Sequence, residues 1–232
     1  MRRTVLVSFA RTPIGRAYKG AFRDTQAQTL AGHAISHAVT RAGLAPDEID
    51  DVILGAALQQ GSQGMNLARQ GALRAGLPIT VPGMTVDRQC ASGLMAIALG
   101  ARMIEGGDAD IIVAGGAESV SLVQNEHFNA YRSQDPWLKE NVPGLYHSML
   151  ETAELVANRY GVSREEQDAY AAQSQARTAA AQERGAFDAE IVPLAVPDED
   201  GAEAPLLTRD EGNRPGTTAE TLAGLTPVML RE

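Results

Sequence analysis

Cys90 is the residue whose type and surroundings point most directly to chemistry. It is the only cysteine among the 232 residues, and it stands where an apolar run meets the start of a helical pattern, within the stretch DRQCASGL at 87–94. A thiolate is favoured at a helix N-terminus by the helix dipole and by the unpaired N–H groups of the first turn. Those N–H groups can also hold the oxyanion of a tetrahedral intermediate. The position therefore predicts an acyl-transfer nucleophile, against the alternative of a small buried apolar side chain.

The segments that must position Cys90 alternate between strand and helix patterns. Apolar, β-branched runs predict strands at 4–8, 51–58, 84–87 and 110–114. Apolar residues at helical spacing predict helices at 27–39, 66–75 and 94–104. This alternation predicts the α/β class, with a parallel or mixed sheet between layers of helices.

The chain changes character after these elements. Residues 119–150 lack regular periodicity, which is typical of a functional loop or lid. Two helices are predicted beyond it, near 149–160 and 164–184. Ser163 and Glu166 form the capping box expected at the start of the second helix.

The last part of the chain is acidic. Residues 197–220 combine acidic side chains with Gly and Pro, which predicts a surface excursion. We therefore predict a first, nucleophile-bearing domain over 1–118 and a second, mostly helical domain over 119–232.

Charge and composition exclude several classes of protein. The net charge of −9 argues against a nucleic-acid interface, which needs a concentrated basic face. No apolar run approaches the length that spans a membrane, and the apolar run at 4–7 is too short for a signal peptide. A single cysteine fits a reducing compartment. We therefore expect a cytoplasmic protein that binds neither nucleic acid nor membrane.

Five short motifs stand out along the first 119 residues. They are ARTPIGR at 10–16, GMNLARQ at 64–70, VPGMTV at 81–86, CASGL at 90–94 and AGGAES at 114–119. Their sequences, order and spacing resemble the thiolase family, with Ala91 where Gly or Ser is usual. The resemblance implies a layered α-β-α N-terminal domain followed by an inserted, mostly helical loop domain.

The family's C-terminal half has no counterpart in this sequence. That half brings a Gly-His-Pro histidine and a second catalytic cysteine, whereas the last histidine here is His147 and Cys90 is the sole cysteine. The family's N-terminal sheet also takes back a strand from beyond the loop domain. The resemblance therefore implies an incomplete fold, with one sheet edge and an apolar face left open.

The resemblance implies an acyl-CoA acyltransferase of lipid metabolism. Such an enzyme forms or cleaves 3-ketoacyl-CoA through an acyl-cysteine, here on Cys90, with coenzyme A thioesters as substrates and no metal or other cofactor. Activity would require the missing base and oxyanion donors. The implied partners are a second copy of the chain or a separate C-terminal half. Two alternatives stay open: a non-catalytic acyl-CoA-binding or assembly subunit, and a decarboxylating condensing enzyme, which AGGAES disfavours.

Four residues outside the nucleophile motif are implied to bind substrate. Met149 opens MLETAE, which resembles the family's pocket segment, and Ser148 stands where short-chain members often carry His. Arg214 in DEGNRPGTT occupies the position of the nucleotide-binding arginine, and Thr221 aligns with a further pocket position. The alternatives are a core residue at the helix start for Met149 and a solvated loop residue for Arg214.

Two other polar features are assigned structural roles. Glu118 is expected to partner a tight turn and not to act as an acid or base. His33 and His37 stand four residues apart on one predicted helix, which is a metal-binding spacing, but they lack a third ligand nearby and are expected to be ordinary helix positions.

Overall fold

The apolar runs that begin near residues 51, 83 and 112 form a parallel sheet of three strands. The computed structural model describes residues 2–195 and 206–229. Its strands are β1 (Asp51–Gly55), β2 (Gly83–Val86) and β3 (Ile112–Gly116), in the order β2-β1-β3. In this register Ile53 lies opposite both Met84 and Ala114. The predicted α/β class with a parallel sheet is confirmed, and the central strand β1 is almost fully buried.

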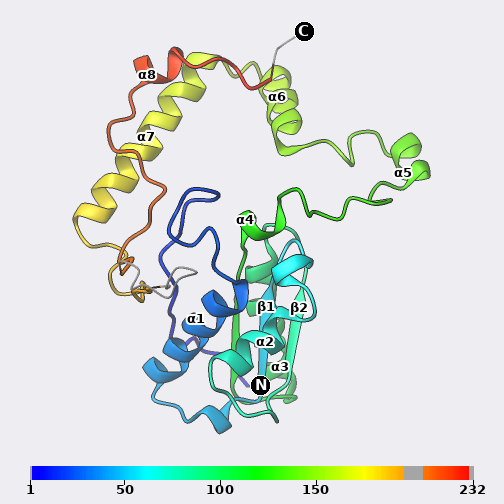
Figure 1. Ribbon diagram of the computed structural model, residues 1–232, viewed down its shortest axis with the longest axis vertical. Coiled ribbons are helices and arrows are strands. Elements are labelled where there is room, and N and C mark those ends of the chain that lie inside the picture. The colour runs from blue at the N-terminus through cyan, green and yellow to red at the C-terminus, as the bar shows by residue number, and fades with distance from the viewer. Residues whose placement is uncertain (1, 196–205, 230–232) are drawn as a thin grey trace. The chain divides into compact units, whose positions relative to one another are not determined.

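Helices cover both faces of this sheet. They are α1 (Ala27–Ala42), α2 (Leu67–Arg74) and α3 (Ser92–Gly106). Helices α1 and α2 pack on each other and on one face, whereas α3 lies on the opposite face (Figure 1). Gly71 allows α2 to approach closely, since a Cβ added there would lie 3.1 Å from Ala31 of α1. The result is the layered α-β-α arrangement that the sequence predicts.

Glycines end two of these helices. Gly43 ends α1 with φ of 71°, and Gly107 ends α3 with φ of 89°. Both values lie in the left-handed region, which glycine adopts at little cost. Short 3-10 helices at Pro46–Glu48 and Gly61–Gln63 complete the connections around β1.

The predicted buried strand at 4–8 is wrong. This segment is not assigned to the sheet, and the side chains of Val5, Leu6 and Val7 are 72%, 79% and 71% exposed. Side-chain hydrogen bonds hold it at its ends, from Thr4 Oγ1 to the carbonyl oxygen of Ala101 at 2.9 Å and from Ser8 Oγ to that of Ala38 at 2.8 Å. A β-branched run becomes a strand only when a neighbouring backbone accepts its hydrogen bonds.

An apolar slot separates this segment from the sheet. The slot has a volume of about 290 Å³ and lies between segment 4–10, strand β3 and the facing sides of α1 and α3. Within the described part of the chain, β3 therefore pairs on its β1 side only. The other edge of β3 and the apolar side chains along the slot are therefore open.

A second unit contains most of the remaining helices. It comprises residues Asn129–Phe187 and Asn213–Glu232. Its helices are α5 (Pro136–Asn141), α6 (Met149–Tyr160), α7 (Arg164–Glu183) and α8 (Ala219–Ala223). The two long helices match their predicted ranges, and Ser163 with Glu166 forms the predicted capping box of α7.

The two units are divided differently from the predicted domains. The first unit runs to Phe128, so it includes α4 (Val120–Val123), and it takes back Asp188–Gly212. Part of the predicted acidic excursion at 197–220 therefore belongs to the first unit, where Leu194 and Leu207 form an antiparallel bridge. The acidic run at 198–200 lies outside the described residues.

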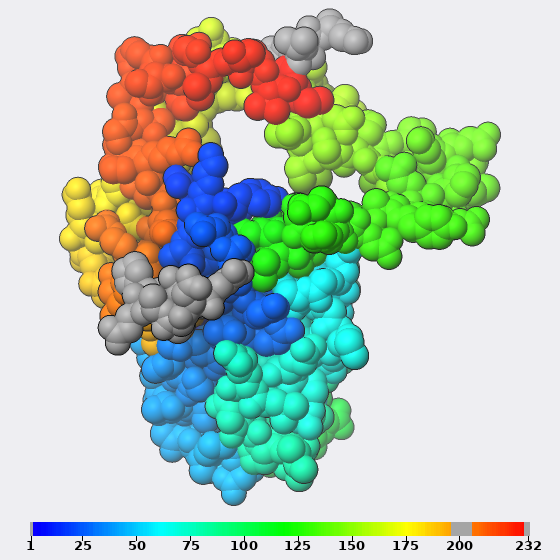
Figure 2. Space-filling view, in the orientation of Figure 1, coloured from blue at the N-terminus to red at the C-terminus, as the bar shows by residue number. Residues whose placement is uncertain are grey.

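The segment after β3 is tied to the N-terminal region. Tyr18 donates its backbone N–H to Ser121 Oγ at 2.9 Å and its hydroxyl to the carbonyl oxygen of Gln124 at 3.0 Å. The two segments adjoin in Figure 2, where the N-terminal region is dark blue and the segment after β3 is green. None of the described helices is both long and apolar enough to cross a membrane.

Candidate active site around Cys90

Cys90 lies in the turn that joins β2 to α3. The thiol is free and exposed, and Ala91 is the residue immediately before the helix. In the part of the chain that the structure describes, the Sγ atom makes no hydrogen bond. Cys90 thus lies at the predicted strand-to-helix junction, and its thiol is open to solvent.

Ser92 fixes the backbone of this turn. Its buried hydroxyl accepts a hydrogen bond from the N–H of Arg88 at 2.8 Å and donates one to the carbonyl oxygen of Gln89 at 2.5 Å. Asp87 Oδ1 accepts the N–H of Gln89 at 2.6 Å, and Gln89 has a φ of 50°. A left-handed residue that is not glycine is retained only where surrounding contacts hold it. These hydrogen bonds therefore fix the backbone position of Cys90.

Two glycines bring the start of α3 directly onto the sheet. A Cβ added to Gly55 would lie 2.2 Å from the carbonyl carbon of Ser92. One added to Gly116 would lie 3.0 Å from the carbonyl oxygen of Gly55 and 3.3 Å from the Cα of Gly93. A side chain at Gly55 would force α3 to shift, and one at Gly116 would require its neighbours to move by a few tenths of an ångström. The positive end of the α3 dipole therefore lies at the carboxyl ends of β1 and β3, close to Cys90.

The two N–H groups that follow Cys90 already donate hydrogen bonds within the turn. Ala91 donates its N–H to the carbonyl oxygen of Arg88 at 3.1 Å, and Ser92 donates its N–H to that of Gln89 at 3.0 Å. Both donors serve the turn itself. An oxyanion hole at Cys90 therefore requires donors other than these two N–H groups.

Glu118 has the structural role that the sequence predicts. Its Oε1 accepts a hydrogen bond from Gln63 Nε2 at 2.6 Å, and its Oε2 accepts one from the N–H of Ala57 at 2.8 Å. Gln63 is fully buried, and its Oε1 accepts the N–H of Ser119. The carboxylate thus joins the turns that follow β1 and β3.

Three of the predicted substrate-binding residues lie at helix starts of the second unit. Ser148 caps α6, because its Oγ accepts the N–H of Glu151 at 3.2 Å while Glu151 Oε2 accepts the N–H of Ser148 at 2.6 Å. The backbone hydrogen bond from Ser148 lowers the pKa of Glu151. Thr221 is the third residue of α8 and completes the capping box of Thr218: it donates its N–H to Thr218 Oγ1 at 3.3 Å, and its Oγ1 accepts the N–H of Thr218 at 3.1 Å. Met149 is 72% exposed, so the alternative of a core residue is wrong.

Arg214 is held by its backbone and leaves its side chain available. Gln175 Oε1 accepts the N–H of Arg214 at 2.7 Å, and Asn213 Nδ2 donates to the carbonyl oxygen of Gln175 at 2.9 Å. The carbonyl oxygen of Arg214 accepts the hydroxyl of Thr217 at 2.8 Å. The guanidinium is exposed and makes no ion pair with the residues that the structure describes.

The predicted site residues are thus distributed over both units. Cys90 belongs to the first unit, whereas Ser148, Met149, Arg214 and Thr221 belong to the second. Their convergence on one substrate stays a prediction.

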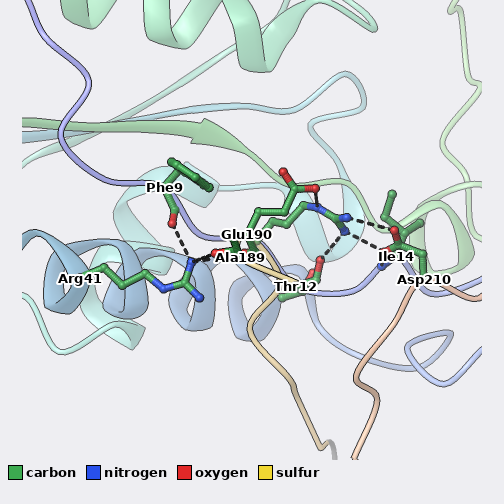
Figure 3. A network of polar contacts seen from close by, with 8 residues as sticks. Phe9, Thr12, Ile14, Arg41, Ala189, Glu190 and Asp210 are labelled. Atoms are coloured by element: carbon green, nitrogen blue, oxygen red, sulfur yellow. Dashed lines mark hydrogen bonds and ion pairs between the residues drawn. The ribbon is translucent and has the colours of Figure 1, made fainter. Parts of the chain in front are cut away.

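An ion-pair network that the sequence analysis missed lies in the first unit (Figure 3). Arg11 donates from Nη1 and Nη2 to the carboxylate of Asp210 at 2.7 and 3.0 Å, and from Nε to Glu190 at 2.8 Å. Asp210 Oδ1 also accepts the N–H of Ile14 at 2.8 Å. Burial alone would raise the pKa of Asp210, but the hydrogen bonds from Arg11 and Ile14 bring it below its usual value.

A second arginine joins the same segments. Arg41 Nη1 donates to the carbonyl oxygens of Phe9 and Ala189, both at 2.9 Å (Figure 3). Arg11 and Asp210 stand in two of the motifs named above, so each was visible in the sequence. Their pairing across 199 positions was not, because no pattern linked the two motifs in space.

His33 and His37 lie side by side on α1, with ring centroids 4.6 Å apart. Burial, and next the neighbouring His37, lower the pKa of His33. Among residues 2–195 and 206–229, no group of three or more His, Cys, Asp or Glu side chains could hold a metal ion.

Comparison with known proteins identifies relatives over the whole chain. Residues 4–232 match a family model described as the thiolase N-terminal domain. Proteins of Staphylococcus aureus strains COL, MSSA476 and MRSA252, each named a probable acetyl-CoA acyltransferase, are 42% identical to this chain over 243 aligned positions. The alignments cover 100% of this chain and 61% of each relative. The chain thus spans about three fifths of the length of the curated relatives it matches.

Proposed function

Because the chain belongs to the thiolase family, we propose that it is the nucleophile-bearing part of an acyltransferase that forms or cleaves 3-ketoacyl-CoA. The observation that carries this proposal is the placement of Cys90, free and exposed in a turn that Ser92 and two glycines hold rigid. The names of the relatives, probable acetyl-CoA acyltransferases, support the reaction class.

The proposed reaction has two steps on the same sulfur. The Cys90 thiolate attacks the carbonyl carbon of an acyl-CoA, the bond from that carbon to the CoA sulfur breaks, and coenzyme A leaves. The acyl group then passes from Cys90 to the enolate carbon of a second acyl-CoA, and the bond from the acyl carbon to Cys90 Sγ breaks. In the cleavage direction the thiolate instead attacks the C3 carbonyl carbon of a 3-ketoacyl-CoA, the C2–C3 bond breaks to release an acyl-CoA enolate that takes up a proton, and the group left on Cys90 passes to the sulfur of coenzyme A. The thioester itself activates the acyl group, so the proposal needs no metal or redox cofactor.

The substrate contacts in this proposal come from the second unit. Arg214 offers a guanidinium that suits a phosphate or an adenine face of coenzyme A. Ser148, Met149 and Thr221 are proposed to line the acyl side of the site. The guanidinium of Arg214 makes no ion pair among the described residues and Met149 is exposed, so both side chains are available for a ligand.

The remaining catalytic groups are proposed to come from a partner. That partner is a second copy of this chain or a polypeptide that carries the C-terminal part of the family's fold. We further propose a cytoplasmic location and a role in lipid metabolism.

One alternative function is favoured by a specific observation. The N–H groups of Ala91 and Ser92 are used within the turn, and Cys90 Sγ has no hydrogen-bonding partner in the described residues. A non-catalytic acyl-CoA-binding or assembly subunit needs neither a free N–H donor nor a hydrogen-bonded thiol at this turn, so both observations agree with it.

Intact-mass spectrometry of the purified chain after incubation with acetyl-CoA distinguishes these functions. The proposed enzyme gains the mass of one acetyl group on the wild type and none on Cys90→Ala. If no adduct forms, and addition of the C-terminal part of a relative does not restore it, the binding or assembly subunit is the better account.

A further inference from the structure

Arg11 joins two segments that are far apart in the sequence. Its contacts with Glu190 and Asp210 form what we call the Arg11 clamp. The side chains of Arg11 and Asp210 are only 29% and 17% exposed, so this pair is better shielded from water than a surface ion pair. A bidentate pair in such a setting fixes geometry as well as charge.

The two acidic residues of the clamp lie at the two ends of the segment that returns to the first unit. Glu190 follows soon after the chain enters that unit at Asp188, and Asp210 comes shortly before the chain leaves it at Gly212. Glu211 strengthens the second end, because its carboxylate accepts the N–H of Arg16 at 2.9 Å and that of Ala21 at 3.1 Å. One arginine therefore holds the chain both where it enters the first unit and where it leaves it.

The residues that follow the clamp are fixed within the second unit. Asn213 and Arg214 are bonded to Gln175 of α7 at 2.9 and 2.7 Å. Gly212 is the single residue between the two bonded groups, and a Cβ added to it would meet nothing within 4 Å. The backbone that presents Arg214 is thus held on both sides, by Arg11 before it and by Gln175 after it.

We propose that Arg11 is a positioning residue for coenzyme A: through Asp210 it preorganises the backbone of Arg214, without touching the ligand. This inference rests on the proposed function of Arg214. A segment that is ordered before binding loses less conformational entropy when the ligand arrives, so its affinity is higher. Without the clamp, residues 210–212 lose their anchor and the backbone of Arg214 is held by Gln175 alone, so coenzyme A must itself order more of this segment.

The test compares thioesters with and without the nucleotide. Arg11→Gln is expected to raise the dissociation constant of coenzyme A roughly tenfold in calorimetry. It should slow acetylation of Cys90 by acetyl-CoA below saturation, while acetylation by S-acetylpantetheine, which lacks the nucleotide, stays at the wild-type rate. Arg11→Lys should behave like Arg11→Gln, because lysine keeps the charge but cannot form the forked contact.

Arg16→Gln is the matched control. It removes the same charge from the same segment, its backbone N–H still reaches Glu211, and its side chain makes no ion pair with the described residues. It should bind coenzyme A like the wild type.

The outcomes distinguish a failure of the positioning role from a failure of the proposed function. Wild-type affinity for coenzyme A in Arg11→Gln, with faster hydrogen exchange at 188–195 and 206–212, would overturn the positioning role alone. Equal loss with both thioesters would show general damage to the fold and overturn it too. A wild-type chain that does not bind coenzyme A would remove the proposed function and this inference together, before any substitution is made.

Discussion

Gly55 ends β1 directly beneath the backbone of Ser92, and this contact sets how closely α3 approaches the sheet. At the scale of single residues, the position of Cys90 depends on such small neighbours more than on any side chain that touches the sulfur. The motif around Cys90 was visible in the sequence. The need for glycine at position 55 was not, because the two stretches meet only after the helix crosses back over the sheet.

Gly55→Ala is expected to destabilise the fold. The added Cβ would lie 2.2 Å from a backbone carbon that cannot move alone, so α3 must shift, at a cost of about 3 kcal/mol in the free energy of unfolding. Urea unfolding measures the loss. Gly115→Ala is the control, since a Cβ there would meet only Leu54 Cδ2 at an ordinary 3.8 Å. Equal stability of the two variants would contradict the close approach of α3.

His33 gives the first unit a dependence on pH. Its pKa is lowered in the folded chain by burial and by His37, whereas an unfolded chain protonates near the ordinary value of about 6.5. The unfolded state therefore gains protons first as the pH falls. The stability present above pH 6.5 is lost on acidification through that value and down to the lower folded pKa.

The expected result is a lower urea midpoint at about pH 5.5 than at about pH 7.5, with a smaller difference in His33→Gln. His127→Gln serves as the control, because the His127 side chain is 84% exposed. If His33→Gln keeps the full pH dependence, another group is responsible.

At the scale of elements, helices were predicted better than strands. The ends of α1 and α3 follow from Gly43 and Gly107, and the start of α7 follows from Ser163, because these signals are local in the sequence. The segment at 4–8 has the composition of a strand, yet its structure depends on whether a neighbouring backbone lies within reach. That is a non-local condition that composition does not report.

Ser163→Ala is expected to weaken α7. The Ser163 hydroxyl accepts the N–H of Glu166 at 3.2 Å, and loss of an N-cap of this kind costs about 1 kcal/mol. Circular dichroism during thermal unfolding should show earlier loss of helix. Ser174→Ala, at an exposed interior position of the same helix, should have no such effect, since alanine is the better helix former. A normal melting curve for Ser163→Ala would mean that packing alone holds the start of α7.

At the scale of the whole molecule, the order of segments along the chain did not show which segments belong to which of the two units. A single boundary near residue 118 looked natural because the composition changes there. The structure instead returns Asp188–Gly212 to the first unit, through the contacts of Arg11 and Arg41. Ion pairs between distant segments have no signature in local composition, so this part of the organisation could not be predicted.

The apolar slot beside β3 should make the chain self-associate. Val5 and Val7 border it and are more than two thirds exposed. The double substitution Val5→Lys and Val7→Lys is expected to reduce self-association in sedimentation velocity and the fluorescence of a bound hydrophobic dye, with little change in stability. Tyr131→Lys, at another highly exposed site in the second unit, is the control. Unchanged association in the double variant would place the contact elsewhere.

The presence of one thiol, exposed at Cys90, has a practical consequence. A maleimide fluorophore or a nitroxide attaches to this chain at a single known position, with no cysteine to remove beforehand. Its signal reports motion at the start of α3, beside the two glycines. Protection from the same reagent after exposure to any thioester counts acylated molecules directly, so a collection of candidate acyl donors can be ranked without an assay for turnover.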